Sequence, residues 1–143
     1  MDKVFTVVLT DDDDDEYFFF EEALNKLDRS ISLQTFPNGE KLLDWMETAD
    51  SIPDALFLDI NMPLLGGFET LQIIRDNKRF DDLPVIIYST SNSILDKNKA
   101  FSYGANLYLC KVIAIKDLSG NLEKIIDAIE NKNLEMIRDF VAF

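Results

Sequence analysis

The chain has 143 residues, 47% of them hydrophobic and 29% charged, which suits one folded domain and leaves little length for a second. Its formal net charge of −13 argues against nucleic-acid binding, because a polyanion would be repelled over most approaches. The lack of histidine and the single cysteine, Cys110, exclude zinc sites, Ser-His-Asp triads and an internal disulfide. The lack of long apolar runs or a signal-peptide pattern predicts a cytoplasmic protein that does not bind membranes.

Short apolar runs alternate along the chain with segments whose apolar residues recur at helical spacing. Strands are predicted at residues 4–10, 31–36, 55–58, 85–88 and 107–110. Helices are predicted at residues 16–27, 40–49, 68–77, 94–103 and 122–130. This alternation predicts an α/β fold, a single doubly wound five-stranded parallel sheet with helices on both faces, because parallel strands need right-handed crossovers. A site is then expected at the carboxyl ends of the strands.

The polar residues at those ends indicate a chemistry. Asp11 and Asp12 follow the first predicted strand, Asp59 the third, Ser89 the fourth and Lys111 the fifth. Three crowded carboxylates raise one another's pKa unless a cation intervenes, and oxygen ligands without nitrogen or sulfur favour Mg²⁺. Since Mg²⁺ and the lysine would balance the three carboxylates, the site predicts phosphoryl transfer to an aspartate, with the serine bonded to a phosphoryl oxygen.

Three segments then carry a family resemblance: residues 7–13 (VVLTDDD), 58–68 (LDINMPLLGGF) and 104–111 (GANLYLCK). Together they resemble the receiver domain of two-component response regulators, in a stand-alone form similar to the chemotaxis regulators. The intervals of 30 residues from Asp59 to Ser89 and of 22 from Ser89 to Lys111 also suit that family. The resemblance implies a flavodoxin-like sheet with strand order 2-1-3-4-5.

The resemblance also implies a role for each carboxylate. Asp59 is the expected phosphoacceptor, and the expected cofactor is Mg²⁺. Asp12 and Asp59 are the expected metal ligands together with the backbone carbonyl of Asn61, while Asp11 acts through water.

Further roles follow for the other strand-end residues. Ser89 and Lys111 are expected to bind the phosphoryl oxygens, and Ser89 and Tyr108 to form the conformational switch. The implied phosphodonor is a phosphohistidine of a sensor histidine kinase or a histidine phosphotransfer protein. The implied output is a downstream protein that binds the face between the fourth and fifth helices. The chain would then catalyse only its own phosphorylation and dephosphorylation.

The sequence departs from the family pattern after the lysine, where Val112 replaces the usual proline. Because a non-prolyl cis bond costs about 3 to 4 kcal/mol, we predict a trans bond between Lys111 and Val112. Gly66 also stands where an aspartate is common, with no evident chemical consequence.

Two apolar segments allow more than one interpretation. Phe18, Phe19 and Phe20 cannot all face inward on one helix, so at least one should be exposed, either as incompletely covered surface or as part of a docking surface for a kinase helix. The receiver domain is predicted at residues 1–131, with 132–143 a tail or an extension of the last helix and no output domain after it. Leu134 and Ile137 stand at helical spacing with Val141, which favours core packing over a partner motif.

Two alternatives for function remain open. One is a degenerate receiver that acts as a constitutive protein-interaction module. The other is a haloacid-dehalogenase-type phosphatase, since Asp11-Asp12-Asp13 contains that family's Asp-x-Asp motif. The nucleophile separates the three hypotheses: Asp59 in a receiver, Asp11 in a phosphatase and none in the interaction module. Asp13, Asp14 and Asp15 are expected only to cap the first helix.

Overall fold

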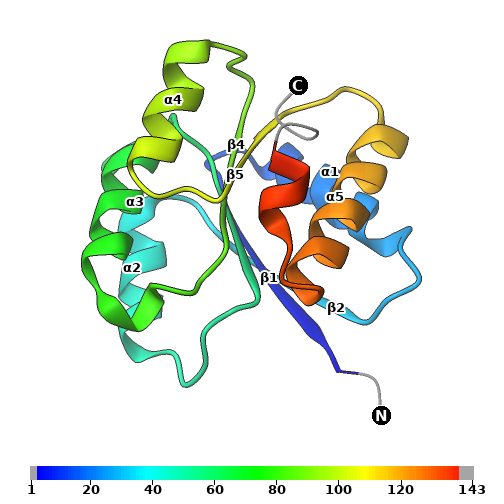
Figure 1. The fold of residues 1–143 in the computed structure, drawn as a ribbon, viewed down its shortest axis with the longest axis horizontal. Helices are drawn as coiled ribbons and strands as arrows, with labels where there is room; N and C mark the ends of the chain where they lie inside the picture. The colour runs from blue at the N-terminus through cyan, green and yellow to red at the C-terminus, as the bar shows by residue number, and fades with distance from the viewer. Residues whose placement is uncertain (1–2, 139–143) are drawn as a thin grey trace.

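The fold is a five-stranded parallel sheet, seen in a computed structural model that describes residues 3–138 (Figure 1). Its strand order is β2-β1-β3-β4-β5, and each neighbouring pair is parallel, which confirms the predicted order. The strands are β1 (Phe5–Thr10), β2 (Ile31–Phe36), β3 (Ala55–Leu58), β4 (Val85–Ser89) and β5 (Leu107–Cys110).

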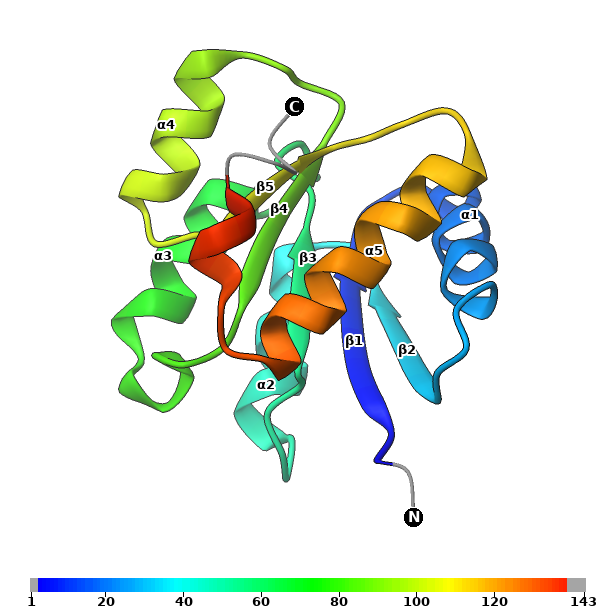
Figure 2. The ribbon, with the colours of Figure 1, turned by 45° about the vertical axis from the view of Figure 1, so that its right-hand side comes forward.

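Helices cover both faces of this sheet. They are α1 (Asp14–Asn25), α2 (Gly39–Thr48), α3 (Gly67–Asp76), α4 (Ile94–Ser102) and α5 (Ile115–Glu130), with short 3-10 helices η1 (Lys78–Phe80) and η2 (Leu134–Ile137). Figure 2 shows α1 and α5 together on one face and α2, α3 and α4 on the other. The doubly wound α/β prediction is therefore confirmed.

The start of the last helix was predicted wrongly. The helix begins at Ile115 rather than at Leu122. The first two turns are rich in polar residues and contain Gly120, which faces open space, so their apolar spacing is weak. Tertiary contacts stabilise these turns: Leu118 is fully buried, and the Ser119 hydroxyl donates to the carbonyl of Ala23 in α1 at 2.8 Å.

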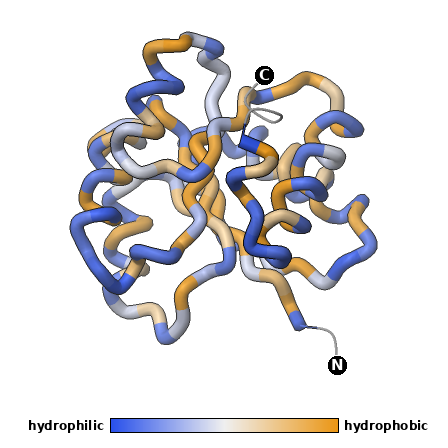
Figure 3. Tube along the Cα trace, viewed as in Figure 1, coloured by the Kyte–Doolittle hydropathy of each residue, from blue (hydrophilic) through white to orange (hydrophobic). Residues whose placement is uncertain are grey.

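Two hydrophobic clusters sandwich the sheet, as period-two alternation requires. Phe57 of β3 faces α1 and α5, where its ring packs edge-on against Phe20 at 5.0 Å. Leu56 and Leu58 face the opposite cluster. Every residue of β3 and β4 is buried. β3 is the middle strand of the five, which confirms that the apolar run at residues 55–58 is a central strand. Figure 3 shows hydrophobic segments gathered at the middle of the fold.

The first helix has the cap and the exposed ring that its sequence predicts. The Asp13 side chain accepts a hydrogen bond from the backbone of Asp15 at 2.9 Å and so caps the helix. Phe20 is buried, Phe19 is partly buried and Phe18 is 71% exposed. One ring of the three is therefore left on the surface.

The segment after α5 turns back at Lys132, whose φ of 55° reverses the chain, and forms η2. Leu134 and Ile137 pack against the cluster between the sheet and the α1–α5 layer, so core packing is confirmed for both. The guanidinium of Arg138 lies 3.7 Å from the ring centroid of Phe101 in α4. Val141 falls outside the described residues.

Candidate functional site at the carboxyl edge of the sheet

Backbone hydrogen bonds beyond the strand ends align the predicted site residues. The amide of Asp59 donates to Thr10 at 3.0 Å, and that of Lys111 donates to Ser89 at 2.8 Å. The amide of Asp11 donates to the carbonyl of the last β2 residue at 3.0 Å. These bonds continue the sheet ladders by one residue, so the strand ends bring the predicted acid, hydroxyl and amine groups to one edge.

Three carboxylates meet at this edge. Oxygens of Asp11, Asp12 and Asp59 all lie within 4.8 Å of one another. Asp11 is fully buried and Asp59 is 7% exposed, whereas Asp12 faces solvent. The Lys111 Nζ lies 2.7 Å from Asp11 Oδ2 and 3.7 Å from Asp59 Oδ2. One ammonium therefore lies near two buried carboxylates. Since the cluster has three carboxylates and one ammonium, it keeps a net negative charge.

For both Asp59 and Lys111, burial and the opposite charge nearby shift the pKa in opposite directions. Burial raises the pKa of Asp59 to about 6, against the lowering influence of Lys111 and of the Ile60 and Asn61 amides, while Asp11 raises it further. Burial lowers the pKa of Lys111, but its hydrogen bond to Asp11 and the nearby charges of Asp59, Asp11 and Glu16 outweigh this, so its pKa is raised. The lysine is therefore a fixed positive charge.

The donor set fits a hard divalent cation. Carboxylate oxygens gather within reach of one ion, and Asp12 opens the cluster to solvent, from which water ligands come. The metal ligands on this chain would be Asp12 and Asp59, with Asp11 through water. Asn61 lies in the loop just after β3, and its carbonyl remains the predicted further ligand.

Ser89 and Tyr108 meet at one loop. Ser89 is fully buried at the end of β4, and its Oγ accepts from the backbone of Ser91 at 3.1 Å. Tyr108 is also fully buried, and its hydroxyl donates to the Ser91 carbonyl at 2.9 Å. The Ser91 hydroxyl in turn donates to Asp96 of α4 at 2.6 Å. The strand-end hydroxyl, the aromatic ring and α4 are thus linked through one residue.

The bond between Lys111 and Val112 is trans, as predicted, since residues 3–138 contain no cis peptide. Val112 packs against the cluster on the α1–α5 side. The lysine reaches the carboxylates without the family's proline.

Sequence reasoning missed two neighbours of the lysine. The Lys111 Nζ lies 5.3 Å from the ring centroid of Tyr88, and the Tyr88 hydroxyl donates to Glu16 Oε1 at 2.6 Å. The available signal was an aromatic residue directly before Ser89 in an otherwise aliphatic strand, and an acid ending the run of aspartates.

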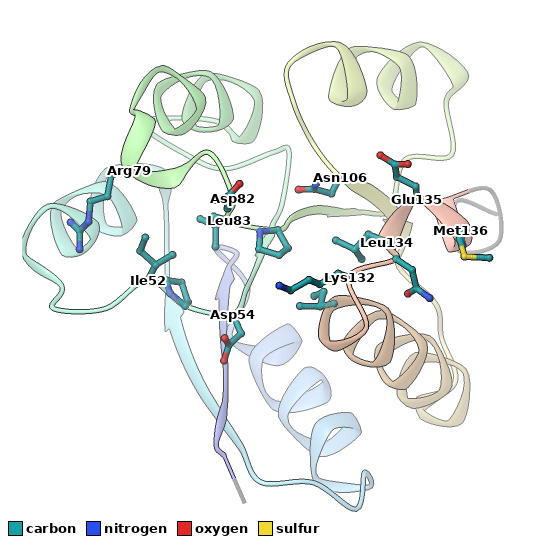
Figure 4. Close-up of a pocket in the computed structure, with 14 residues that line it drawn as sticks. Ile52, Asp54, Arg79, Asp82, Leu83, Asn106, Lys132, Leu134, Glu135 and Met136 are labelled. Atoms are coloured by element: carbon teal, nitrogen blue, oxygen red, sulfur yellow. The ribbon is translucent and has the colours of Figure 1, made fainter.

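A cavity of about 1030 Å³ lies away from this site, at the opposite edge of the sheet (Figure 4). It is lined by residues that precede β3, β4 and β5 and by the segment after α5, among them Asp54, Leu83, Asn106 and Leu134. None of the predicted site residues lines it. Within residues 3–138 no helix has the length and apolar character needed to span a membrane.

Comparison with known proteins agrees with the geometry. The family model of the response regulator receiver domain matches residues 7–123. PilG of Pseudomonas aeruginosa is 36% identical over 75 residues, 52% of this chain and 56% of PilG. RcaC of Microchaete diplosiphon is 36% identical over 78 residues, 54% of this chain and 12% of RcaC. The phosphorylated cyanobacterial phytochrome response regulator RcpA superposes with a TM-score of 0.81 at 21% identity, covering 91% of this chain and 96% of RcpA.

The chain therefore belongs to the receiver-domain family of two-component response regulators. Its members are signalling modules, and the RcpA comparison shows the shared fold. The matched region covers about half of PilG and about one eighth of RcaC, so the activities of those whole proteins are not carried over. Family membership and the strand-end geometry together speak against the phosphatase alternative.

Proposed function

We propose that this chain is a phosphorylatable switch that accepts a phosphoryl group on Asp59, in a Mg²⁺-dependent reaction in the cytoplasm. The donor would be a phosphohistidine of a sensor histidine kinase or a histidine phosphotransfer protein. The observation that carries the proposal is the buried carboxylate of Asp59, 3.7 Å from the ammonium of Lys111 and within 4.8 Å of two further carboxylates.

The contacts of Lys111 support Asp59, rather than Asp11, as the proposed nucleophile. Asp11 Oδ1 accepts from the amide of Asp13 at 3.1 Å, and Asp11 Oδ2 accepts from Lys111 at 2.7 Å. Both oxygens of Asp11 are therefore engaged, one of them by the ammonium. The carboxylate of Asp59 is met by the backbone amides of Ile60 and Asn61, but its Oδ2 lies 3.7 Å from the ammonium, beyond hydrogen-bond distance. In the transfer, an Asp59 oxygen forms a bond to phosphorus while the donor's P–N bond breaks and the imidazole leaves with the electron pair.

The residues around Asp59 suit the new phosphoryl group. The ammonium of Lys111 lies 3.7 Å from Asp59 Oδ2 and would bind one phosphoryl oxygen, and the Ser89 hydroxyl would donate to another. A bound Mg²⁺ supplies charge neutralisation for the phosphoryl oxygens. Asp12 and Asp59 would hold the ion, and the ion pair with Asp11 keeps Lys111 at the site.

The switch would work through the loop that joins Ser89, Tyr108 and α4. When the hydroxyl of Ser89 turns to a phosphoryl oxygen, its bond from the Ser91 amide weakens, and the loop that carries the Tyr108 contact is free to shift. This alters the face between α4 and α5, where we expect a downstream protein to bind. Phe18 on α1 offers an apolar contact for a kinase helix.

The acceptor is tested by intact mass. We expect a gain of one phosphoryl group when the protein is incubated with Mg²⁺ and acetyl phosphate, and none in Asp59→Asn or with chelator. Phosphoramidate, whose P–N bond matches that of phosphohistidine, serves as a second donor. A label that persists in Asp59→Asn and disappears in Asp11→Asn would overturn the assignment. If neither donor adds a phosphoryl group to the wild type, the interaction-module alternative would replace the phosphorylatable switch.

The role of Lys111 is tested separately. We expect Lys111→Ala to take up some phosphoryl label at Asp59, because the acceptor and metal ligands remain, but to lose most of the conformational response. Intact mass measures uptake, and amide NMR shifts of the Tyr108 and α4 residues measure the response. Lys116→Ala, which removes an exposed lysine of α5, is the matched control. A full α4 response in Lys111→Ala would contradict this role.

A further inference from the structure

An aromatic ring lies close to the site lysine, in addition to the carboxylates of Asp11 and Asp59. Leu9, Phe57 and Leu109 belong to the cluster on the α1–α5 side, and the next inward position on each strand is Asp11, Asp59 and Lys111 respectively. Tyr88 belongs to the same cluster. Its ring lies 5.3 Å from the Lys111 Nζ, and the lysine side chain is only 14% exposed, so the ammonium lies between two carboxylates and an aromatic ring.

The ring itself is held from several directions. Tyr88 is fully buried, and its hydroxyl donates to Glu16 Oε1 in the first turn of α1 at 2.6 Å. Its ring packs edge-on against Phe20 at 5.5 Å and against Phe57 at 6.4 Å. The two ring contacts and the hydroxyl bond hold the ring independently of the lysine. The Tyr88–Glu16 bond joins residues 72 positions apart and has no part in the metal cluster or the switch loop.

We propose that Tyr88 is a positioning residue for phosphoryl transfer, whose ring holds the ammonium of Lys111 between Asp11 and Asp59 and is itself anchored through its hydroxyl by Glu16. This inference rests on the proposed function of Asp59 as phosphoacceptor.

The chemistry of a ring suits this task better than a further charge. A lysine side chain is long and flexible. The ion pair with Asp11, without a second contact, would leave most of the Lys111 side chain mobile. A desolvated ammonium is attracted to the face of an aromatic ring. Because the ring has no net charge, it competes less strongly than a carboxylate would with the phosphoryl oxygens for the ammonium. The lysine can therefore leave Asp11 for a phosphoryl group on Asp59 while staying over the ring. A carboxylate in the place of Tyr88 would hold the ammonium back.

The first test measures phosphorylation rates with acetyl phosphate and Mg²⁺, read by intact mass. Tyr88→Leu removes the ring, and we expect the rate to fall about threefold to tenfold. Tyr88→Phe keeps the ring and loses the anchor, so a smaller loss is expected. In the Lys111→Ala background, Tyr88→Leu should cause no further loss, because the ring acts only through the lysine. Phe80→Leu, which removes a buried ring on the other face of the sheet, should leave the rate unchanged.

The second test does not depend on activity. In ¹³C-lysine-labelled protein, the ring of Tyr88 should shift the Lys111 side-chain protons upfield, with the signal assigned through Lys111→Arg. The shift should persist in Tyr88→Phe and vanish in Tyr88→Leu. An unshifted Lys111 signal in the wild type, a normal rate in Tyr88→Leu, or a further loss in the double variant would each overturn the inference. Failure of the wild type to take any label would instead refute the proposed function on which the inference rests.

Discussion

Asp59→Asn should stabilise the protein in the presence of chelator, by about 3 kcal/mol at pH 7. The reason is that burial, together with the charge of Asp11, raises the pKa of Asp59 to about 6, from 3.8, despite the opposing charge of Lys111. An ionised Asp59 therefore costs folding free energy at neutral pH, and asparagine removes that cost while keeping the shape. Urea unfolding at constant ionic strength measures the difference.

The pH dependence of this difference follows from linkage. Because the folded state holds the proton of Asp59 more tightly than the unfolded state, wild-type stability falls relative to Asp59→Asn as pH rises. The difference should be near zero at about pH 4, grow through the window up to about pH 6 and stay constant above it. Excess Mg²⁺ should reduce this difference in stability between the wild type and Asp59→Asn, because an ion that binds the folded wild type stabilises its folded state.

The matched control is Asp12→Asn, which removes an exposed carboxylate of the same cluster. Solvent screens this charge, so its removal should stabilise the protein much less. Equal effects of the two substitutions, or a loss of stability in Asp59→Asn, would show that the cost of the Asp59 charge has been misjudged.

Arg75→Ala should destabilise the protein by about 3 kcal/mol. The Arg75 guanidinium donates to the carbonyls of Gly104, Phe80 and Leu83 at 2.9, 2.8 and 2.8 Å, and to Asn106 Oδ1 at 3.0 Å. It thereby ties the end of α3 to the segments that lead into β4 and β5. Removing it leaves partly buried acceptors without a donor, which costs more than the loss of one exposed hydrogen bond.

The control for Arg75→Ala is Arg79→Ala. Arg79 also donates to two backbone carbonyls, of Met46 and Ala49, but from a more exposed position, so its loss should cost less than about 1 kcal/mol. Arg75→Lys should lose nearly as much stability as Arg75→Ala, because an ammonium cannot reproduce the planar array of donors. Urea denaturation compares the three variants, and a lysine variant as stable as wild type would show that charge, not geometry, matters at this position.

The sequence predicted the fold because each local signal agreed with the others. Buried strands such as residues 55–58 are continuous apolar runs, and the helices between them have apolar residues at helical spacing. The exception was the start of α5 at Ile115, where the apolar spacing is weak and the helix depends on contacts such as that of Ser119 with α1. A pattern within one segment cannot report a contact that another segment supplies.

The same reasoning explains how far the site could be predicted. Asp59, Ser89 and Lys111 were found because a parallel sheet brings the carboxyl ends of its strands to one edge, and topology alone then places them. Tyr88 and Glu16 were missed because their contact joins a strand to a helix 72 residues away.

By itself, therefore, the sequence determined the alternation of strands and helices, the acidic cluster and the lysine of the site, since these depend on periodicity and on which residue follows each strand. The strand order came from the family resemblance. Only the tertiary structure decided which oxygens the lysine contacts, which aromatic ring its ammonium lies over and which carbonyls Arg75 joins. These features depend on side-chain directions and on distances of a few ångströms between distant segments, which are set when the helices pack against the sheet.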